Sequence, residues 1–90
     1  MKILIVEDEP SLREIMVRTL TREQYVVEQA ADYAAALDKI AAYDYDCILL
    51  DIMLPDGSGL KLLEELKRRG LRAGAVSYTH LRAHETAANL

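Results

Sequence analysis

The sequence predicts an α/β fold built on a parallel sheet, because three short apolar runs alternate with three segments of helical periodicity. The first run, Ile3-Leu4-Ile5-Val6, is continuous and rich in β-branched residues, which is typical of a strand buried on both faces. A βαβαβα order implies right-handed crossovers with helices on both faces of the sheet. We therefore expect an incomplete doubly wound sheet with the strand order 2-1-3.

The three expected strands differ in polarity. Residues 3–6 and 47–50 are continuously apolar and suit the interior of a sheet. Residues 25–30 become polar toward their end, which favours a position at the sheet edge.

The three helical segments are recognised by their spacing and by their ends. The first, over residues 10–23, begins at Pro10-Ser11, and its polar side is formed by Arg13, Glu14, Arg18 and Arg22. The second follows Asp32, a suitable N-cap, and ends at Ala42. After a turn at residues 55–59, the third runs from Leu60 to a basic end before Gly70, in agreement with dipole and C-cap preferences.

Composition excludes several classes of protein. The 90 residues allow one small domain, and the net charge of −4 argues against direct binding to nucleic acid or to an anionic membrane. The apolar start is interrupted by Glu7-Asp8-Glu9, too early for a signal peptide or a membrane span, so we expect a cytoplasmic protein. The single cysteine, Cys47, cannot form an internal disulfide and is expected to be a buried core thiol.

Acidic residues follow two of the strands directly. Glu7 and Asp8 come after the first strand, and Asp51 comes after the third. In an open parallel sheet the carboxyl ends of the strands share one edge, and ligands bind where the strand order reverses. With the order 2-1-3, these carboxylates meet in one cleft, where an all-oxygen site suits Mg²⁺. Each half alone has a plainer interpretation, a solvated helix-entry cluster for Glu7-Asp8-Glu9 and a turn residue for Asp51.

The two acidic stretches resemble the signature sequences of response-regulator receiver domains. The stretches are residues 1–9 (MKILIVEDE) and residues 48–59 (ILLDIMLPDGSG), and the resemblance covers residues 1–74. It is nearest to receivers that precede a winged-helix DNA-binding domain. The resemblance implies a flavodoxin-like fold and a signalling role rather than an enzymatic one.

The resemblance also implies a role for each site residue. Asp51 would accept a phosphoryl group from a histidine of a sensor kinase. Asp8 would bind Mg²⁺ directly, Glu7 mostly through water, and the main-chain carbonyl of Met53 would be a further ligand. The parent protein would be a transcriptional regulator.

The last part of the chain, residues 75–90, differs in character. Helical periodicity ends after Gly74, and residues 76–86 (VSYTHLRAHET) resemble the in-frame translation of a transposase-type sequencing adapter. We therefore divide the chain into a partial receiver domain, residues 1–74, and a non-native tail, residues 75–90. The alternative is a genuine fourth strand at residues 75–79, and a foreign segment could also be drawn into that strand position.

The family pattern has parts that find no match in this chain. These are a Ser or Thr after a fourth strand, a Lys after a fifth strand, two further helices, the dimerisation face and the effector domain. We expect the polypeptide by itself to lack part of the cover on the face that holds the first helix, to fold poorly, and to be impaired in switching.

Two alternative functions fit the sequence less well. A phosphatase or phosphotransferase with an aspartate nucleophile needs a second acid two residues after Asp51, where this chain has Met53. A degenerate receiver used only for binding disagrees with the presence of both Asp8 and Asp51 in the parent protein, but it stays open for this chain.

Overall fold

The computed structural model describes residues 1–51, 59–69 and 74–78, and no helix within these ranges is long and apolar enough to cross a membrane. The elements are β1 (Lys2–Val6), α1 (Pro10–Arg22), β2 (Val26–Ala30), α2 (Tyr33–Ala42), β3 (Cys47–Asp51), α3 (Gly59–Arg68) and β4 (Gly74–Tyr78). They confirm the three predicted strands and three predicted helices, with differences only at the ends. Of the turn expected at residues 55–59, Gly59 is the first residue of α3, and the other four residues lie outside the described residues, as does the cap at Gly70.

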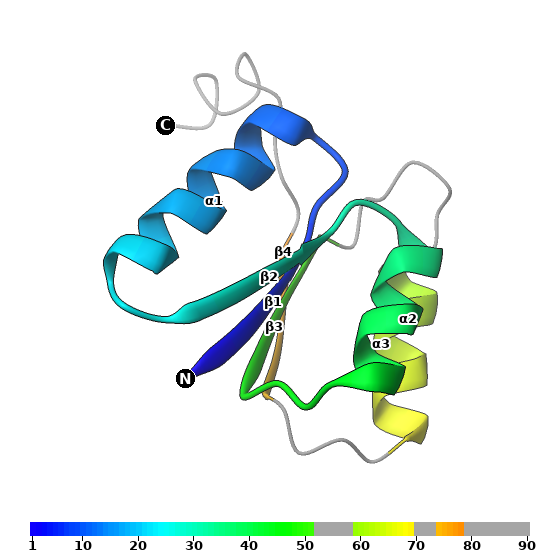
Figure 1. Ribbon diagram of the computed structural model, residues 1–90. Helices are drawn as coiled ribbons and strands as arrows, with labels where there is room; N and C mark the ends of the chain where they lie inside the picture. Colours follow the sequence, from blue (N-terminus) through cyan, green and yellow to red (C-terminus); the bar gives the residue numbers. More distant parts are fainter. Residues whose placement is uncertain (52–58, 70–73, 79–90) are drawn as a thin grey trace.

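The strands form one parallel sheet in the order β2-β1-β3-β4 (Figure 1). The predicted order 2-1-3 and the edge position of β2 are confirmed. The fourth strand pairs with β3 from Cys47↔Gly74 to Asp51↔Tyr78, so the strand position beside β3 is filled by a segment that begins one residue before the expected tail.

The helices lie on both faces of this sheet. The helix α1 covers one face over β1 and β2, and α2 and α3 cover the other (Figure 1). The principal core lies under α2 and α3, where alternate residues of the strands meet the apolar sides of both helices. Its buried members are Leu4, Val6, Ala30, Ala36, Ile40, Tyr45, Ile48, Leu50, Leu62 and Leu66.

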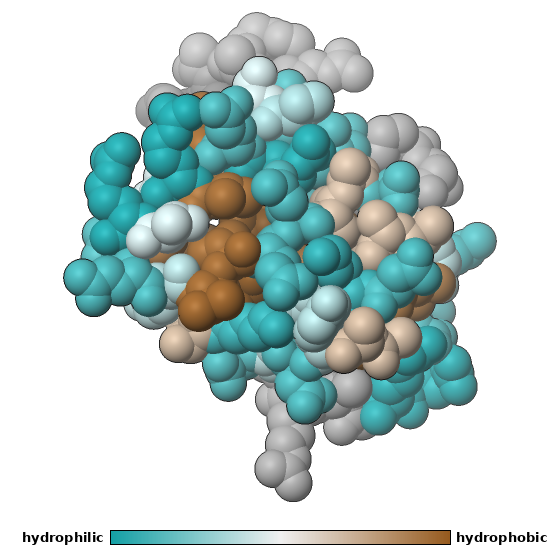
Figure 2. Space-filling view, in the orientation of Figure 1, coloured by the Kyte–Doolittle hydropathy of each residue, from teal (hydrophilic) through white to brown (hydrophobic). Residues whose placement is uncertain are grey.

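The face under α1 is less completely covered. Ile3 and Ile5 are buried there, but α1 itself has no fully buried residue. Between α1 and β3 lies an apolar groove of about 240 Å³, and Figure 2 shows apolar residues gathered beside α1. The groove is lined by Ile15, Met16, Thr19, Leu20 and Leu49. Cys47, on the same face of β3 as Leu49, is half-buried, so the prediction of a buried core thiol was wrong.

The ends of α1 and the start of α2 are fixed by local hydrogen bonds. The carboxylate of Glu9 accepts hydrogen bonds from the amides of Ser11 and Leu12 and caps α1, while Asp32 caps α2 as predicted by accepting from the Ala35 amide. After α1, Gln24 has a φ of 70°, in the left-handed region that ends many helices. This turn is why α1 ends at Arg22 and β2 begins only at Val26.

Candidate functional site

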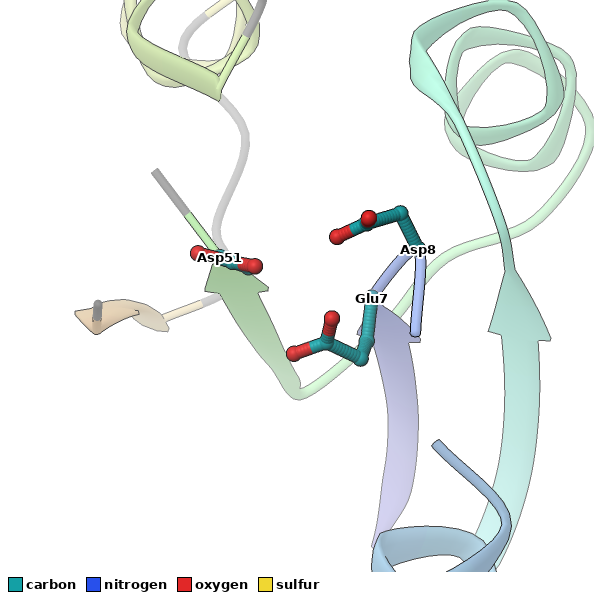
Figure 3. Close-up of side chains that lie close together, drawn as sticks. All are labelled: Glu7, Asp8 and Asp51. Atoms are coloured by element: carbon teal, nitrogen blue, oxygen red, sulfur yellow. The ribbon is translucent and has the colours of Figure 1, made fainter. Parts of the chain in front are cut away.

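Three carboxylates meet where β1 and β3 end. The pairing of β1 with β3 places Val6 beside Leu50, so Glu7 and Asp8 follow one strand just where Asp51 ends its neighbour. One side-chain oxygen from each of the three acids lies within 4.8 Å of the other two (Figure 3). The structure therefore brings together Glu7, Asp8 and Asp51 as the sequence predicted. The fourth predicted ligand, Met53, lies outside the described residues.

The three acids are sheltered from solvent to different degrees. The side chains of Glu7 and Asp51 are fully buried, with 0% of each residue exposed. Glu7 is tied to the backbone on both sides, because its amide donates to the Ala30 carbonyl (3.1 Å) and its Oε2 accepts from the Glu9 amide (3.0 Å). Asp8 is half-buried overall, yet its Oδ1 is buried and has no hydrogen-bond partner among the described residues.

This arrangement fits a divalent cation. Buried carboxylates repel one another, and a buried oxygen without a partner is unfavourable unless something satisfies it. A hard cation bound to several carboxylate oxygens would satisfy Oδ1 of Asp8 and offset the mutual repulsion of the three acids. The donor set holds only oxygen, which suits Mg²⁺ better than a metal that prefers nitrogen or sulfur.

The structure adds one residue to the site that sequence reasoning missed. Arg13 was assigned to the polar, outer side of the first helix, but its guanidinium is half-buried and reaches back over the β1–α1 turn. It donates from Nη1 to the main-chain carbonyl of Glu7 at 2.8 Å and to that of Asp8 at 3.5 Å, and from Nε to Oε1 of Gln29 at 3.0 Å. The sequence signal that could have indicated this role is a basic residue, Arg13, in the second turn of the helix that follows the acidic pair Glu7-Asp8.

Comparisons with known proteins agree with the fold. Residues 3–90 match the response regulator receiver domain family. The transcriptional regulatory protein TcrA of Mycobacterium tuberculosis is 38% identical over 68 residues, which are 76% of this chain and 27% of TcrA. The chain spans 27% to 35% of the length of curated relatives such as TcrA.

Solved structures share the fold over nearly the whole chain. The response regulator TrrA of Thermotoga maritima, bound to Mg²⁺-BeF, has 25% identity and a TM-score of 0.75, covering 98% of this chain and 93% of TrrA. The structure of TrrA in complex with the histidine kinase ThkA has 34% identity and a TM-score of 0.78, and the match covers 91% of this chain and 73% of the matched chain. A Burkholderia pseudomallei response regulator with a phosphorylated aspartic acid, a calcium ion and citrate has 28% identity and a TM-score of 0.82. The match covers 97% of this chain and 51% of that response regulator.

A parallel sheet in the order β2-β1-β3-β4 with helices on both faces is the flavodoxin-like α/β fold that receiver domains share. The chain belongs to the response regulator receiver domain family.

Proposed function

We propose that this chain is the phosphate-accepting part of a two-component response regulator, with Asp51 as the acceptor and with Glu7, Asp8 and Asp51 as the Mg²⁺ site. The observation that carries the proposal is the convergence of three carboxylates from two adjacent strand ends, with oxygens within 4.8 Å of one another. When bound, Mg²⁺ would neutralise charge on the phosphoryl oxygens. Met53 is proposed as a carbonyl ligand from the family resemblance, and Glu7 as an acid that acts mostly through water.

The proposed reaction needs positioning more than acid–base chemistry. A carboxylate oxygen of Asp51 bonds to the phosphorus of a phosphohistidine, the phosphorus–nitrogen bond breaks, and its electron pair stays on the imidazole nitrogen. The product is an acyl phosphate on Asp51. The position of Asp51 at the end of β3 supports this role, because a residue in a paired strand has its backbone fixed in direction. In this reaction Asp51 is itself the group that is modified, so the chain acts as a signalling substrate rather than as an enzyme.

The proposed partners come from the relatives. The complex of TrrA with ThkA supports a sensor histidine kinase as the phosphoryl donor. Relatives named as transcriptional regulatory proteins support a parent protein with a DNA-binding effector domain and receiver dimerisation, located in the cytoplasm. The net charge of −4 supports a receiver that does not itself contact nucleic acid.

The acceptor is tested by phosphorylation with a small phosphodonor and Mg²⁺. We expect one phosphoryl group per chain by intact mass, released by base and converted by hydroxylamine to a hydroxamate at Asp51. Asp51→Asn should abolish the adduct. The matched control is Asp44→Asn, an exposed aspartate that precedes the opposite end of β3, which should leave labelling unchanged. An adduct that survives in Asp51→Asn would overturn the assignment of the acceptor.

We also propose that residues 1–74 are the receiver portion and residues 75–90 are a non-native tail. The likeness of residues 76–86 to a translated sequencing adapter supports this division. The pairing of Gly74–Tyr78 with β3 is compatible with it, since any extended segment can complete the hydrogen bonds of an open strand edge. Sequencing the source gene past codon 74 tests the division, and recovery of the same codons from independent genomic DNA would contradict it.

For the 90-residue polypeptide by itself, we propose impaired switching. The family relays phosphorylation through a hydroxyl after the fourth strand and a lysine after the fifth, and neither has a match in residues 1–74. We expect hydrogen exchange to change on phosphorylation only close to Asp51. Altered exchange across α2 and the β2 edge would contradict this.

A further inference from the structure

Arg13 joins the three elements that surround the acidic turn. It lies in α1, and its guanidinium reaches the carbonyls of Glu7 and Asp8, which follow β1, and the side chain of Gln29, which lies near the end of β2. One planar group therefore bridges a helix and the ends of two adjacent strands. Arginine suits this position because its donors are arranged in a rigid fork that can serve several acceptors at once.

Further hydrogen bonds among the described residues hold the turn that carries the acids at its two ends. At the strand end, the Glu7 amide donates to the Ala30 carbonyl at 3.1 Å. At the helix end, Glu9 caps α1, and its own amide donates to the Glu7 carboxylate. Arg13 supplies the contacts in the middle, to the carbonyls of Glu7 and Asp8.

The hydrogen bonds from Arg13 to the main chain matter because they hold the backbone that carries the Asp8 carboxylate. Its Oδ1 is buried and has no hydrogen-bond partner among the described residues, so no described hydrogen bond of that atom fixes the direction of the carboxylate. In Figure 3 the Asp8 carboxylate projects toward Asp51 across the gap between the two strand ends. The backbone from which it projects is held by Arg13.

We propose that Arg13, oriented by Gln29, is a positioning residue for the cation site. It fixes the Glu7–Asp8 turn so that the carboxylates are in place before the cation arrives, and it does so without contacting the cation. The inference rests on the proposed function, because it concerns the same acidic site. Outer residues that orient the ligands of a metal typically change its affinity by roughly 10- to 100-fold when they are replaced.

The experiment measures Mn²⁺ binding to the 90-residue chain by calorimetry, together with thermal unfolding in the absence of metal. Arg13→Met keeps the aliphatic stem but removes all donors, and we expect roughly 10-fold weaker binding. The matched control is Arg18→Met, on the same helix, where the guanidinium forms only an exposed ion pair with Glu14 at 2.6 Å among the contacts described. That variant should bind Mn²⁺ within about twofold of wild type, because exposed pairs contribute little.

Two further variants keep the inference testable if Arg13→Met unfolds. Gln29→Met removes only the group that orients the guanidinium, at an exposed position, and should also weaken binding with no loss of thermal stability. Arg13→Lys should recover the stability but not the affinity, since one ammonium cannot serve the same acceptors in the same geometry.

The outcomes separate this inference from the proposed function. Wild-type affinity in both Gln29→Met and Arg13→Lys would overturn the positioning role while the acidic site itself stands. Absence of Mn²⁺ binding in the wild-type chain would overturn the proposed metal site as well. Weaker binding in the Arg13 and Gln29 variants, with Arg18→Met unaffected, would support the role.

Discussion

The two faces of the sheet are covered to different degrees. On the face under α2 and α3, the strand residues Leu4, Val6, Ile48 and Leu50 are all at most 1% exposed, and both helices contribute fully buried residues. On the face under α1, that helix contributes none, and β3 contributes the half-buried Cys47 and Leu49. The difference follows from where α1 lies, because it packs over β1 and β2 and leaves β3 bordered by a groove.

The unequal cover of the two faces indicates which face contributes most to the stability of the chain. Burial of apolar area is the main favourable contribution to folding, so the face under α2 and α3 should contribute most of it. The acidic site lies at the strand ends between the two faces, and elements on each face hold its acids in place. Asp51 is the last residue of a strand anchored in the α2 and α3 core, and the Glu7–Asp8 turn is held by Arg13 from α1.

The largest expected effect is on the well-covered face. Leu50→Ala removes a side chain that is 0% exposed from the core under α2 and α3. We expect a loss of about 3 kcal/mol in the free energy of unfolding, from lost burial plus the cavity left behind. Urea unfolding followed by far-UV circular dichroism measures it, and a loss below about 1 kcal/mol would show that this core is not closely packed.

The adjacent residue on the other face gives the matched comparison. Leu49→Ala makes the same chemical change one position earlier in β3, where the side chain is half-buried beside the groove. We expect a loss of about 1–1.5 kcal/mol, because the native side chain is only partly removed from water and solvent can fill the space. Equal losses for Leu49→Ala and Leu50→Ala would contradict the unequal cover of the two faces.

The sequence predicts the strands and the acidic site better than it predicts burial on the face under α1. Continuous apolar runs predicted β1 and β3, and acids placed directly after them predicted the three carboxylates at one edge. The same continuity predicted that Cys47 would be buried, which was wrong, because an apolar strand does not reveal how far a helix extends across the sheet. Burial raises the pKa of the Cys47 thiol above its ordinary value even so.

Arg13 shows a second limit of sequence reasoning. Helical periodicity assigned it to the polar side of α1, and that assignment says nothing about a long side chain that folds back along its own helix. Its partners are the main-chain carbonyls of the residues that follow β1. Every residue has a carbonyl, so the sequence does not indicate which carbonyls will accept these hydrogen bonds. Contacts of this kind become visible only once the entry angle of the helix is known.

A polar cluster on the well-covered face gives the smallest expected effect. Tyr45 is 7% exposed, and its hydroxyl donates to Glu28 at 2.8 Å, where Lys39 also binds the same oxygen at 3.1 Å and Lys2 binds the other at 3.3 Å. Burial and the neighbouring carboxylate keep the pKa of the Tyr45 phenol well above its ordinary value of 10.0, so it remains a donor. The hydrogen bond from Tyr45, followed by that from Lys39, holds the pKa of Glu28 below its ordinary value of 4.5.

Tyr45→Phe should therefore destabilise the chain in a pH-dependent way. At neutral pH we expect a loss of about 1 kcal/mol, the usual net value of one hydrogen bond. Because the pKa of Glu28 is lower in the folded chain than in the unfolded one, this contribution is present above pH 4.5 and is lost as the pH falls through the folded value. The difference between wild type and Tyr45→Phe should shrink in acid, while Tyr43→Phe, at an exposed ring 4.4 Å from the Lys2 ammonium, should have little effect at any pH. A difference that stays constant from neutral pH into acid would mean that Tyr45 acts by packing alone, and the well-covered face would then depend on apolar contacts without help from its polar cluster.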